Sequence, residues 1–202
     1  MSATIPWPDG KPRCRWCAAA PEFLAYHDHE WGFPVDDDRR LFEKLCLEGF
    51  QSGLSWRTIL AKRPRFRTVF HDFDIERVAR FGERDVERLL QDPGIVRHRG
   101  KIEATINNAK RARELVAREG SLAAYVWRYE PTEADQAAPQ SQTTSAASVA
   151  MSRDLKKRGW SFVGSTTVFA FMQAMGLIND HAEDCAFREE AARARAGFRR
   201  PG

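Results

Sequence analysis

The sequence has little cysteine and lacks the long apolar run of a membrane protein. Its four cysteines are too few for the disulfide framework of a small secreted protein. The longest apolar stretch, 163–178, is shorter than the ~20 residues that a helix needs to cross a bilayer. Residues 1–14 lack the basic start and apolar core of a signal peptide. We therefore expect a cytoplasmic protein with no membrane partner, whose cysteines are thiols or metal ligands.

The sequence also lacks the alternation of polar and apolar residues that predicts β-strands, and it contains no internal repeat. Apolar residues recur instead at helical spacings, which predicts an all-α fold. Ser55, Asp74 and Ser165 are expected to cap helix N-termini. The expected helices are 36–51, 56–64, 75–82, 83–91, a long helix that follows the turn at 92–94 and includes Val116, 152–158, and 166–178.

Composition divides the chain into an arm, one domain and a tail. Residues 1–12 hold three prolines and are expected to form a flexible arm. Residues 13–187 are expected to form a single domain, in which the Ala-, Gln- and Ser-rich segment 130–149 is a surface loop. Residues 188–202 are rich in arginine and are expected to form a frayed basic tail. The net charge of +4 permits nucleic-acid binding without establishing it.

Cysteine and histidine gather near the two ends of the chain, at Cys14, Cys17, His27, His29, His181 and Cys185. Two thiolates and two imidazoles would hold Zn²⁺ in a closed tetrahedral site, which is structural because no coordination position is open to a substrate. Spacing leaves two ligand sets open. One combines Cys14 and Cys17 with His181 and Cys185, and the other replaces Cys17 with His27. The alternative is that the thiols are incidental and His181 caps a helix.

Glu48 is expected at the edge of the apolar stripe of helix 36–51. A carboxylate there is either paired inside the fold or placed to receive a polar ligand. The sequence around it is dense in aromatic residues, namely Trp16, Phe23, Tyr26, Trp31 and Trp56. Flat rings and one directed acceptor suit a nucleobase pocket, in which the base stacks on a ring and donates its exocyclic amine. The plainer alternative is a tryptophan core around a salt-bridged glutamate.

Between residues 95 and 113, six basic residues stand against one acidic residue, a net charge of +5. Gly94 and Gly100 flank the turn, and a helix is expected to begin directly after it. Backbone N–H groups at a helix start can bind phosphate, and basic side chains add non-specific affinity for DNA. The segment 83–117 thus resembles a helix-hairpin-helix, although its glycine spacing is looser than in the usual motif. The alternative is a solvated charged helix face.

Together these features closely resemble the DNA-3-methyladenine glycosylase I family, a bacterial base-excision family of the helix-hairpin-helix superfamily. The resemblance runs in order from residue 13 to residue 185. The motifs that carry it are RCRW at 13–16, YHDHEWG at 26–32, CLEGFQSGLSW at 46–56, IVRHRGKI at 95–102, KKRGWSFVG at 156–164 and NDH at 179–181. Two departures are Phe23 and Phe50, which stand where the family commonly has a tyrosine and a glutamine.

The resemblance implies a helix-hairpin-helix glycosylase-like fold in which a structural Zn²⁺ joins the N- and C-terminal segments. It implies a monomer whose partner is double-stranded DNA containing alkylated adenine. The implied residues are the zinc ligands Cys14, His27, His181 and Cys185, the catalytic carboxylate Glu48, the base-binding residues Tyr26, Trp56, Trp16 and Phe23, and the DNA-binding residues Leu54, Arg97, His98, Arg99, Gly100 and Lys101.

The implied activity is hydrolysis of the N-glycosidic bond of 3-methyladenine, with the base flipped into an aromatic pocket and an abasic site left behind. No lysine nucleophile is evident at the matched pocket positions, which favours a monofunctional glycosylase without lyase activity. The alternative is a non-catalytic, zinc-stapled helix-hairpin-helix module that binds DNA. That module would need the basic turn but not Glu48.

Overall fold

The computed structural model describes residues 2–202, which form helices and one short antiparallel ladder, so the all-α prediction is confirmed. No helix within this range combines the length and apolar composition that crossing a bilayer requires. The elements are β1 (Thr4–Ile5), β2 (Arg13–Cys14), η1 (Arg15–Ala19), α1 (Glu22–His29), α2 (Asp38–Gln51), α3 (Trp56–Val69), η2 (His71–Phe73), α4 (Ile75–Val78), α5 (Glu83–Leu90), α6 (Arg99–Glu119), α7 (Leu122–Trp127), η3 (Glu133–Asp135), α8 (Ala146–Lys157), α9 (Ser165–Ala174) and α10 (Arg188–Ala196).

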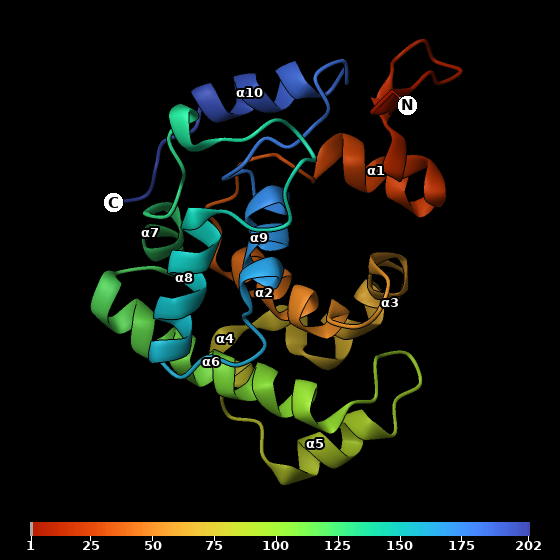
Figure 1. Cartoon of the computed structure of the whole chain (residues 1–202). Helices are drawn as coiled ribbons and strands as arrows, with labels where there is room; N and C mark the ends of the chain where they lie inside the picture. Colours follow the sequence, from red (N-terminus) through yellow and green to blue (C-terminus); the bar gives the residue numbers. More distant parts are fainter. Residues whose placement is uncertain (1) are drawn as a thin grey trace.

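Helix α2 is the centre of the molecule. Every residue from Leu41 to Phe50 is buried, and the helix contacts α3, α6, α7 and α9. In Figure 1, α2 and α9 lie in the middle, with α1 and α10 on one side and α4 to α6 on the other. Helix α9 packs against α2, with Thr166 exposed and Gln173 half-buried. Because α2 is buried along most of its length, its charged residues Lys44 and Glu48 lie inside the fold.

Two of the three expected helix caps are confirmed. Ser55 accepts a hydrogen bond from the Thr58 amide, and Asp74 accepts one from the Arg77 amide. Ser165 is instead the first helical residue, and Gly164 occupies the cap. Helices begin with a residue in extended backbone conformation, and Gly164 has it with φ −61° and ψ 160°.

Helix α3 does not end near Pro64 as expected but continues to Val69. A proline inside a helix costs about 3 kcal/mol because it removes one hydrogen bond and crowds the preceding turn. Phe66 and Val69, which follow the proline, are buried in the core. Burying two such side chains stabilises the fold by about 3 kcal/mol or more, which offsets the cost of the proline.

The two ends of the chain are more ordered than the sequence suggests. Thr4 and Ile5 of the expected flexible arm pair with Cys14 and Arg13. The expected frayed tail forms α10, and the Phe198 ring packs 4.5 Å, between centroids, from that of Trp127. Helix α8 also begins at Ala146 rather than at 152, because Ser145 and Ser148 form a capping box. The frayed-tail expectation was wrong because Arg195 of α10 pairs with Glu130, whose side chain is 11% exposed, and lies over the Trp127 ring.

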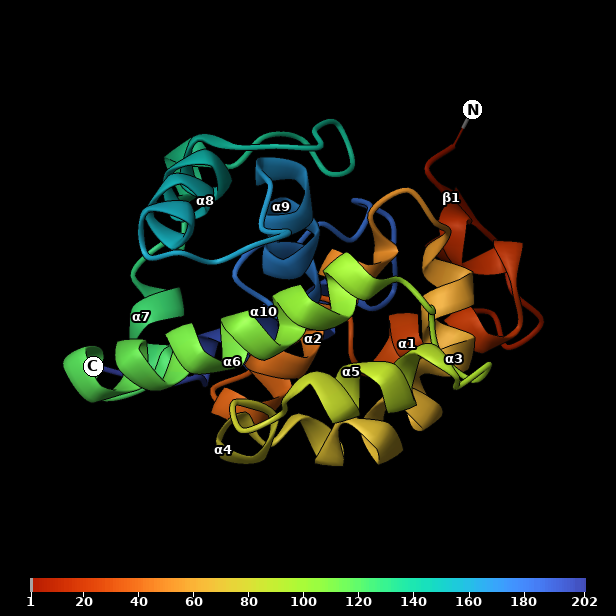
Figure 2. The ribbon, with the colours of Figure 1, turned by 90° about the horizontal axis from the view of Figure 1, so that it is seen from below.

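Helix α5, the turn after it and the long helix α6 form the helix, turn and helix that the sequence predicts. Figure 2 shows both helices in front, with α6 crossing α2. Helix α3 holds the turn, since Lys62 Nζ donates to the Pro93 carbonyl at 2.7 Å and Arg65 pairs with Asp92 at 2.7 Å. A Cβ at Gly94 would lie 2.5 Å from Arg65 Cγ, so glycine permits this close approach.

Candidate active site

A cavity of about 420 Å³ opens between α1, α2, α3, α9 and the segment around residues 140–143. It brings together residues from both halves of the chain. Four of the aromatic residues singled out in the sequence line it, together with Glu48 and a set of amide and hydroxyl side chains. The lining residues are Trp16, Tyr26, Trp31, Glu48, Gln51, Trp56, Gln140, Gln142, Thr143, Thr166, Phe169, Ala170, Gln173 and Asp180.

Glu48 is 5% exposed, and its carboxylate is held by an unexpected partner. Lys44, one turn earlier on α2, places its Nζ 2.7 Å from Glu48 Oε1. The same ammonium donates to the Tyr26 hydroxyl at 2.7 Å and lies 3.4 Å from the centre of the Trp56 ring. Sequence reasoning missed Lys44, although its i,i+4 spacing to Glu48 puts both side chains on one helix face.

Burial changes the proton affinity of this group of side chains. It raises the pKa of Tyr26 well above the ordinary value, and the nearby Glu48 charge adds to the effect. Burial lowers the pKa of Lys44, against the opposing charge and hydrogen bond of Glu48. The tyrosine therefore keeps its proton and remains available as a hydrogen-bond donor.

The aromatic residues divide into those that face the cavity and those that support it. Trp56 and Trp16 are half-buried and line the cavity. Phe23 is not among the lining residues and packs edge-on behind Trp16, with ring centroids 5.7 Å apart. Phe50 points into the core against Phe66, at 4.6 Å between centroids. The two departures from the family pattern thus lie outside the cavity wall.

Asp180 is a second buried carboxylate in the cavity and was not singled out from the sequence. It accepts hydrogen bonds from the Gln140 amide at 2.8 Å and from Gln173 Nε2 at 2.5 Å. Burial raises the pKa of Asp180. Because its oxygens hold the segment around residue 140 against α9, Asp180 positions this wall of the cavity.

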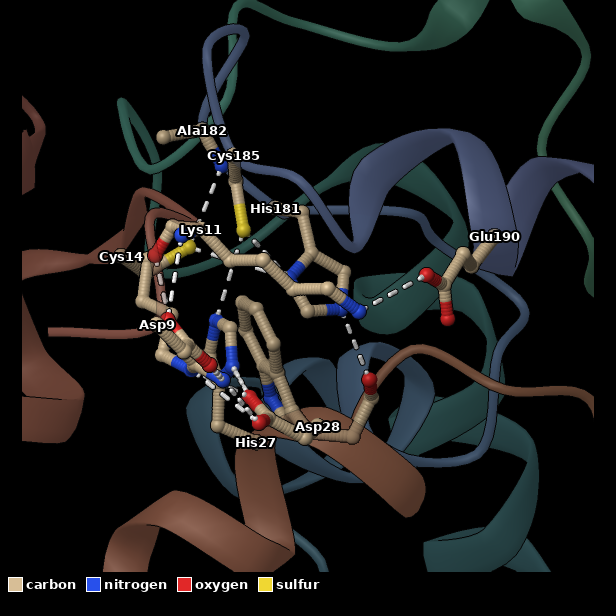
Figure 3. Close-up of polar contacts among 11 residues, drawn as sticks. Asp9, Lys11, Cys14, His27, Asp28, His181, Ala182, Cys185 and Glu190 are labelled. Carbon is tan, nitrogen blue, oxygen red and sulfur yellow. Dashed lines mark hydrogen bonds and ion pairs between the residues drawn. The ribbon is translucent and has the colours of Figure 1, made fainter. Parts of the chain in front are cut away.

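Next to the cavity, Cys14, His27, His181 and Cys185 form a buried cluster whose ligand atoms all lie within 4.8 Å of one another. Figure 3 shows the Cys185 sulfur directed toward the rings of His181 and His27. Cys185 Sγ lies 3.6 Å from His27 Nε2 and 3.5 Å from His181 Nδ1, and Cys14 Sγ lies 3.7 Å from His181 Nδ1. The Cys14 thiol and the two imidazoles lower the pKa of Cys185, which favours a thiolate.

This donor set fits Zn²⁺. In a tetrahedral zinc site with two sulfur and two nitrogen ligands, an S···N edge is about 3.6 Å. The remaining ring nitrogens are also engaged, since His27 Nδ1 lies 2.7 Å from Asp28 Oδ1 and His181 Nε2 lies 2.9 Å from the Trp31 carbonyl. Such outer partners fix the tautomer of metal-binding histidines and leave the inward nitrogen free to bind.

Of the two ligand sets that spacing left open, the structure brings together the one that contains His27. Cys17 is buried and reduced but lies outside the cluster. The reason lies in the local structure, because Cys17 sits in η1 whereas His27 sits on the inner face of α1.

Helix α1 links the cluster to the cavity. Its neighbouring residues Tyr26 and His27 serve the two sites, Tyr26 lining the cavity and His27 joining the cluster. The Trp16 ring packs against both, with centroids 6.3 Å from Tyr26 and 5.3 Å from His27. Movement of α1 would therefore disturb both sites together.

The basic turn carries less free charge than its composition suggests. Arg99 pairs with Glu83, Glu87 and Glu103. Lys101 is 7% exposed and turns inward, donating to the Phe50 and Ser52 carbonyls at 2.9 and 2.6 Å. Among residues 2–202, Arg97 has no ion-pair partner.

Lys101 fastens the loop that carries Leu54. This loop joins α2 to α3, and Gln51 Nε2 donates to the Leu54 carbonyl at 2.7 Å. Leu54 is 40% exposed.

Phe162 is the other large apolar side chain that is exposed to a similar extent in the described part of the chain. The Phe162 ring lies 6.4 Å from that of His98, between centroids. Sequence reasoning missed Phe162, whose exposure depends on the loop between α8 and α9.

The model of the methyladenine glycosylase family matches residues 16–189 of the chain. The chain belongs to this family. It is 48% identical over 177 residues to DNA-3-methyladenine glycosylase 1 of Escherichia coli (strain K12), which covers 86% of this chain and 95% of that protein.

Solved structures agree with this assignment. A crystal structure of 3-methyladenine DNA glycosylase I superposes with a TM-score of 0.80 at 47% identity, covering 86% of this chain and 98% of the other. A variant of 3-methyladenine DNA glycosylase I in complex with 3-methyladenine superposes with a TM-score of 0.81 at 36% identity, covering 87% and 97%. The resemblance drawn from the motifs is confirmed, and the protein is an enzyme of the glycosylase class.

Proposed function

We propose that this methyladenine glycosylase removes 3-methyladenine from alkylated duplex DNA by hydrolysing its N-glycosidic bond. The observation that carries the proposal is the buried Glu48 carboxylate in an aromatic cavity, with Oε1 held by Lys44 and Oε2 without a hydrogen-bond partner within residues 2–202. A flipped base stacks on Trp56, on the face opposite Lys44, and donates its exocyclic amine to Glu48.

The chemistry needs little acid catalysis. Methylation at N3 makes the attached adenine cationic, so the base takes the electron pair of the breaking bond and leaves neutral. Water adds to the sugar carbon, loses a proton to solvent and leaves an abasic site. Guanine presents an acceptor where adenine presents its amine, so Glu48 rejects it by repulsion and by an unpaired buried group.

A lyase step is not part of the proposal. It would require an amine that reaches the sugar carbon, and Lys44 is the lysine beside the pocket. Its Nζ is held by Glu48 and Tyr26, and Lys44 is not among the residues that line the cavity. Borohydride treatment should therefore trap no covalent adduct with DNA.

In this proposal, DNA binds to two segments: the α2–α3 loop, which contains Leu54, and the turn before α6. Leu54 enters the base stack at the flipped nucleotide, and Arg97, His98 and the Gly100 amide contact phosphates. Arg99 and Lys101 act differently, because the first is held by three glutamates and the second faces the α2–α3 loop. We assign these two a positioning role.

Zn²⁺ is the metal that Cys14, His27, His181 and Cys185 would hold, one ion per chain. With four protein ligands the ion has no position for water or substrate, so it stabilises the fold and supplies no chemistry to the reaction. We further propose that the protein acts as a monomer in the cytoplasm, with DNA as its macromolecular partner.

The deciding experiment measures free 3-methyladenine released from alkylated duplex DNA by wild type and by Glu48→Ala. Loss of the carboxylate should lower the rate by about 100-fold or more, since the base loses its directed acceptor. Glu189→Gln, a change at an 88%-exposed side chain on α10, serves as the control and should match wild type. Release no faster than the spontaneous rate by wild-type protein that still binds DNA would favour the non-catalytic binding module instead.

A further inference from the structure

Lys44 is a buried cation for which the reaction described above gives no role. It lies on α2, at the centre of the molecule, and its side chain is 6% exposed. Burying an ammonium group is costly unless it is paired and hydrogen-bonded. Its contacts are with candidate pocket residues, namely Glu48, Tyr26 and Trp56. Its retention in the core is therefore best explained by what it does to those residues.

The hydrogen bonds of Lys44 determine which groups in the pocket donate and which accept. An ammonium group donates and never accepts, so the Tyr26 oxygen accepts from Lys44 at 2.7 Å. The tyrosine's own O–H must then donate elsewhere, and within residues 2–202 it has no other hydrogen-bond partner. Tyr26 lines the cavity, so this donor is available to a ligand. Lys44 likewise occupies Glu48 Oε1 and leaves Oε2 as the acceptor.

We propose that Lys44 is a specificity-determining positioning residue, which orients Tyr26 as a donor and Glu48 as an acceptor toward the base. Adenine matches this pair along one edge, where N7 accepts and the exocyclic amine donates. Guanine presents two acceptors along the same edge and matches only the tyrosine. The inference rests on the proposed function and adds the residue that sets its selectivity.

Lys44 also cancels the buried charge of Glu48. N3-methylated adenine is cationic while attached to the sugar and neutral once released. An unpaired carboxylate would hold the attached cation more tightly than the departing base, and stronger ground-state binding of this kind slows the reaction. The Lys44–Glu48 pair presents the hydrogen-bonding pattern without a net charge.

The first test uses wild-type protein and two free bases. 3-Methyl-7-deazaadenine has a C–H in place of N7 and cannot accept from Tyr26. Tryptophan fluorescence should show it binding about tenfold more weakly than 3-methyladenine, the loss of one hydrogen bond. Tyr26→Phe should bind the two bases equally. Equal binding by wild type would overturn the inference, while wild type that releases no 3-methyladenine from DNA would overturn the proposed function itself.

The second test compares the same two bases in Lys44→Met. Without the ammonium, the Tyr26 oxygen has lost the donor from which it accepts, so its O–H is no longer directed toward the base. The variant should therefore lose the tenfold preference for 3-methyladenine over its 7-deaza analogue.

Lys156→Met removes one exposed positive charge on α8, outside the cavity lining, and should keep the wild-type preference. A Lys44→Met protein that binds both bases more weakly but keeps the tenfold preference would mean that Lys44 only supports packing, which contradicts the proposal. If Lys44→Met does not fold, the comparison of the two bases in wild type still decides the matter.

Discussion

The four-residue cluster and the aromatic cavity share α1 but differ in how their polar groups are satisfied. In the cluster, one ring nitrogen of each histidine is hydrogen-bonded to a protein oxygen, and the other faces a cysteine sulfur. In the cavity, one oxygen of Glu48 and the O–H of Tyr26 have no hydrogen-bond partner in the described part of the chain. Buried polar groups are normally satisfied, so the completed cluster suits structure and the incomplete cavity suits a ligand.

The largest effect should come from breaking the cluster. Cys185→Ser removes one of four zinc ligands, and we expect the free energy of unfolding to fall by several kcal/mol because metal binding is coupled to folding. Metal content by mass spectrometry and thermal unfolding with and without a chelator check this. Cys17→Ser is the matched control, since Cys17 is equally buried but lies outside the cluster. An unchanged melting temperature with lost base release would place the cluster in the chemistry.

A smaller effect should separate two arginines of the turn. Arg97→Ala should weaken binding to undamaged duplex and reduce the slope of log affinity against log salt by about 1, as expected for one lost phosphate contact. Arg99→Ala should leave that slope unchanged, because its charge is already engaged by glutamates. Fluorescence titrations at several salt concentrations measure both. Equal slopes for the two variants would contradict the distinction.

The smallest effect concerns the ion pair that ties α1 to α3 beside the cavity. Burial of Glu30 raises its pKa, but the hydrogen bond and charge of Arg63 outweigh this and lower it overall. A carboxyl whose folded pKa is depressed stabilises the fold above its unfolded pKa and loses that contribution as pH falls through the folded value. Glu30→Gln should therefore cost about 1 kcal/mol or less at pH 7, and that cost should shrink as the pH falls below the ordinary pKa of a glutamate. Denaturant unfolding over a series of pH values would show this, and the same cost at every pH would mean that packing dominates.

The fold was predictable where local signals agree with tertiary packing. Ser55 and Asp74 cap helices because a side chain and a nearby amide suffice. Pro64 predicts a helix end that the structure does not have, since the burial of Phe66 that outweighs the proline depends on long-range packing. Helix α7 was missed because all six of its residues are buried, so no polar face marks its period.

The site residues that lie in recognisable sequence motifs were predictable. Glu48, Tyr26, Trp56 and Trp16 meet in one cavity as expected. The choice of His27 over Cys17 needed the resemblance, because both sets have acceptable spacing. The inward turn of Lys101 depends on carbonyls some 50 positions earlier in the chain, which no local pattern encodes.

The sharing of α1 has a consequence for the order of events during synthesis. Tyr26 and His27 leave the ribosome early, whereas His181 and Cys185, which complete the cluster around His27, come at least 150 positions later. The contacts that hold α1 from this side therefore form only after residues 181–185 have emerged and folded back. A nascent chain that stops before residue 180 contains Glu48 but lacks these contacts and the cavity residue Asp180. We therefore expect the site to be completed late in synthesis.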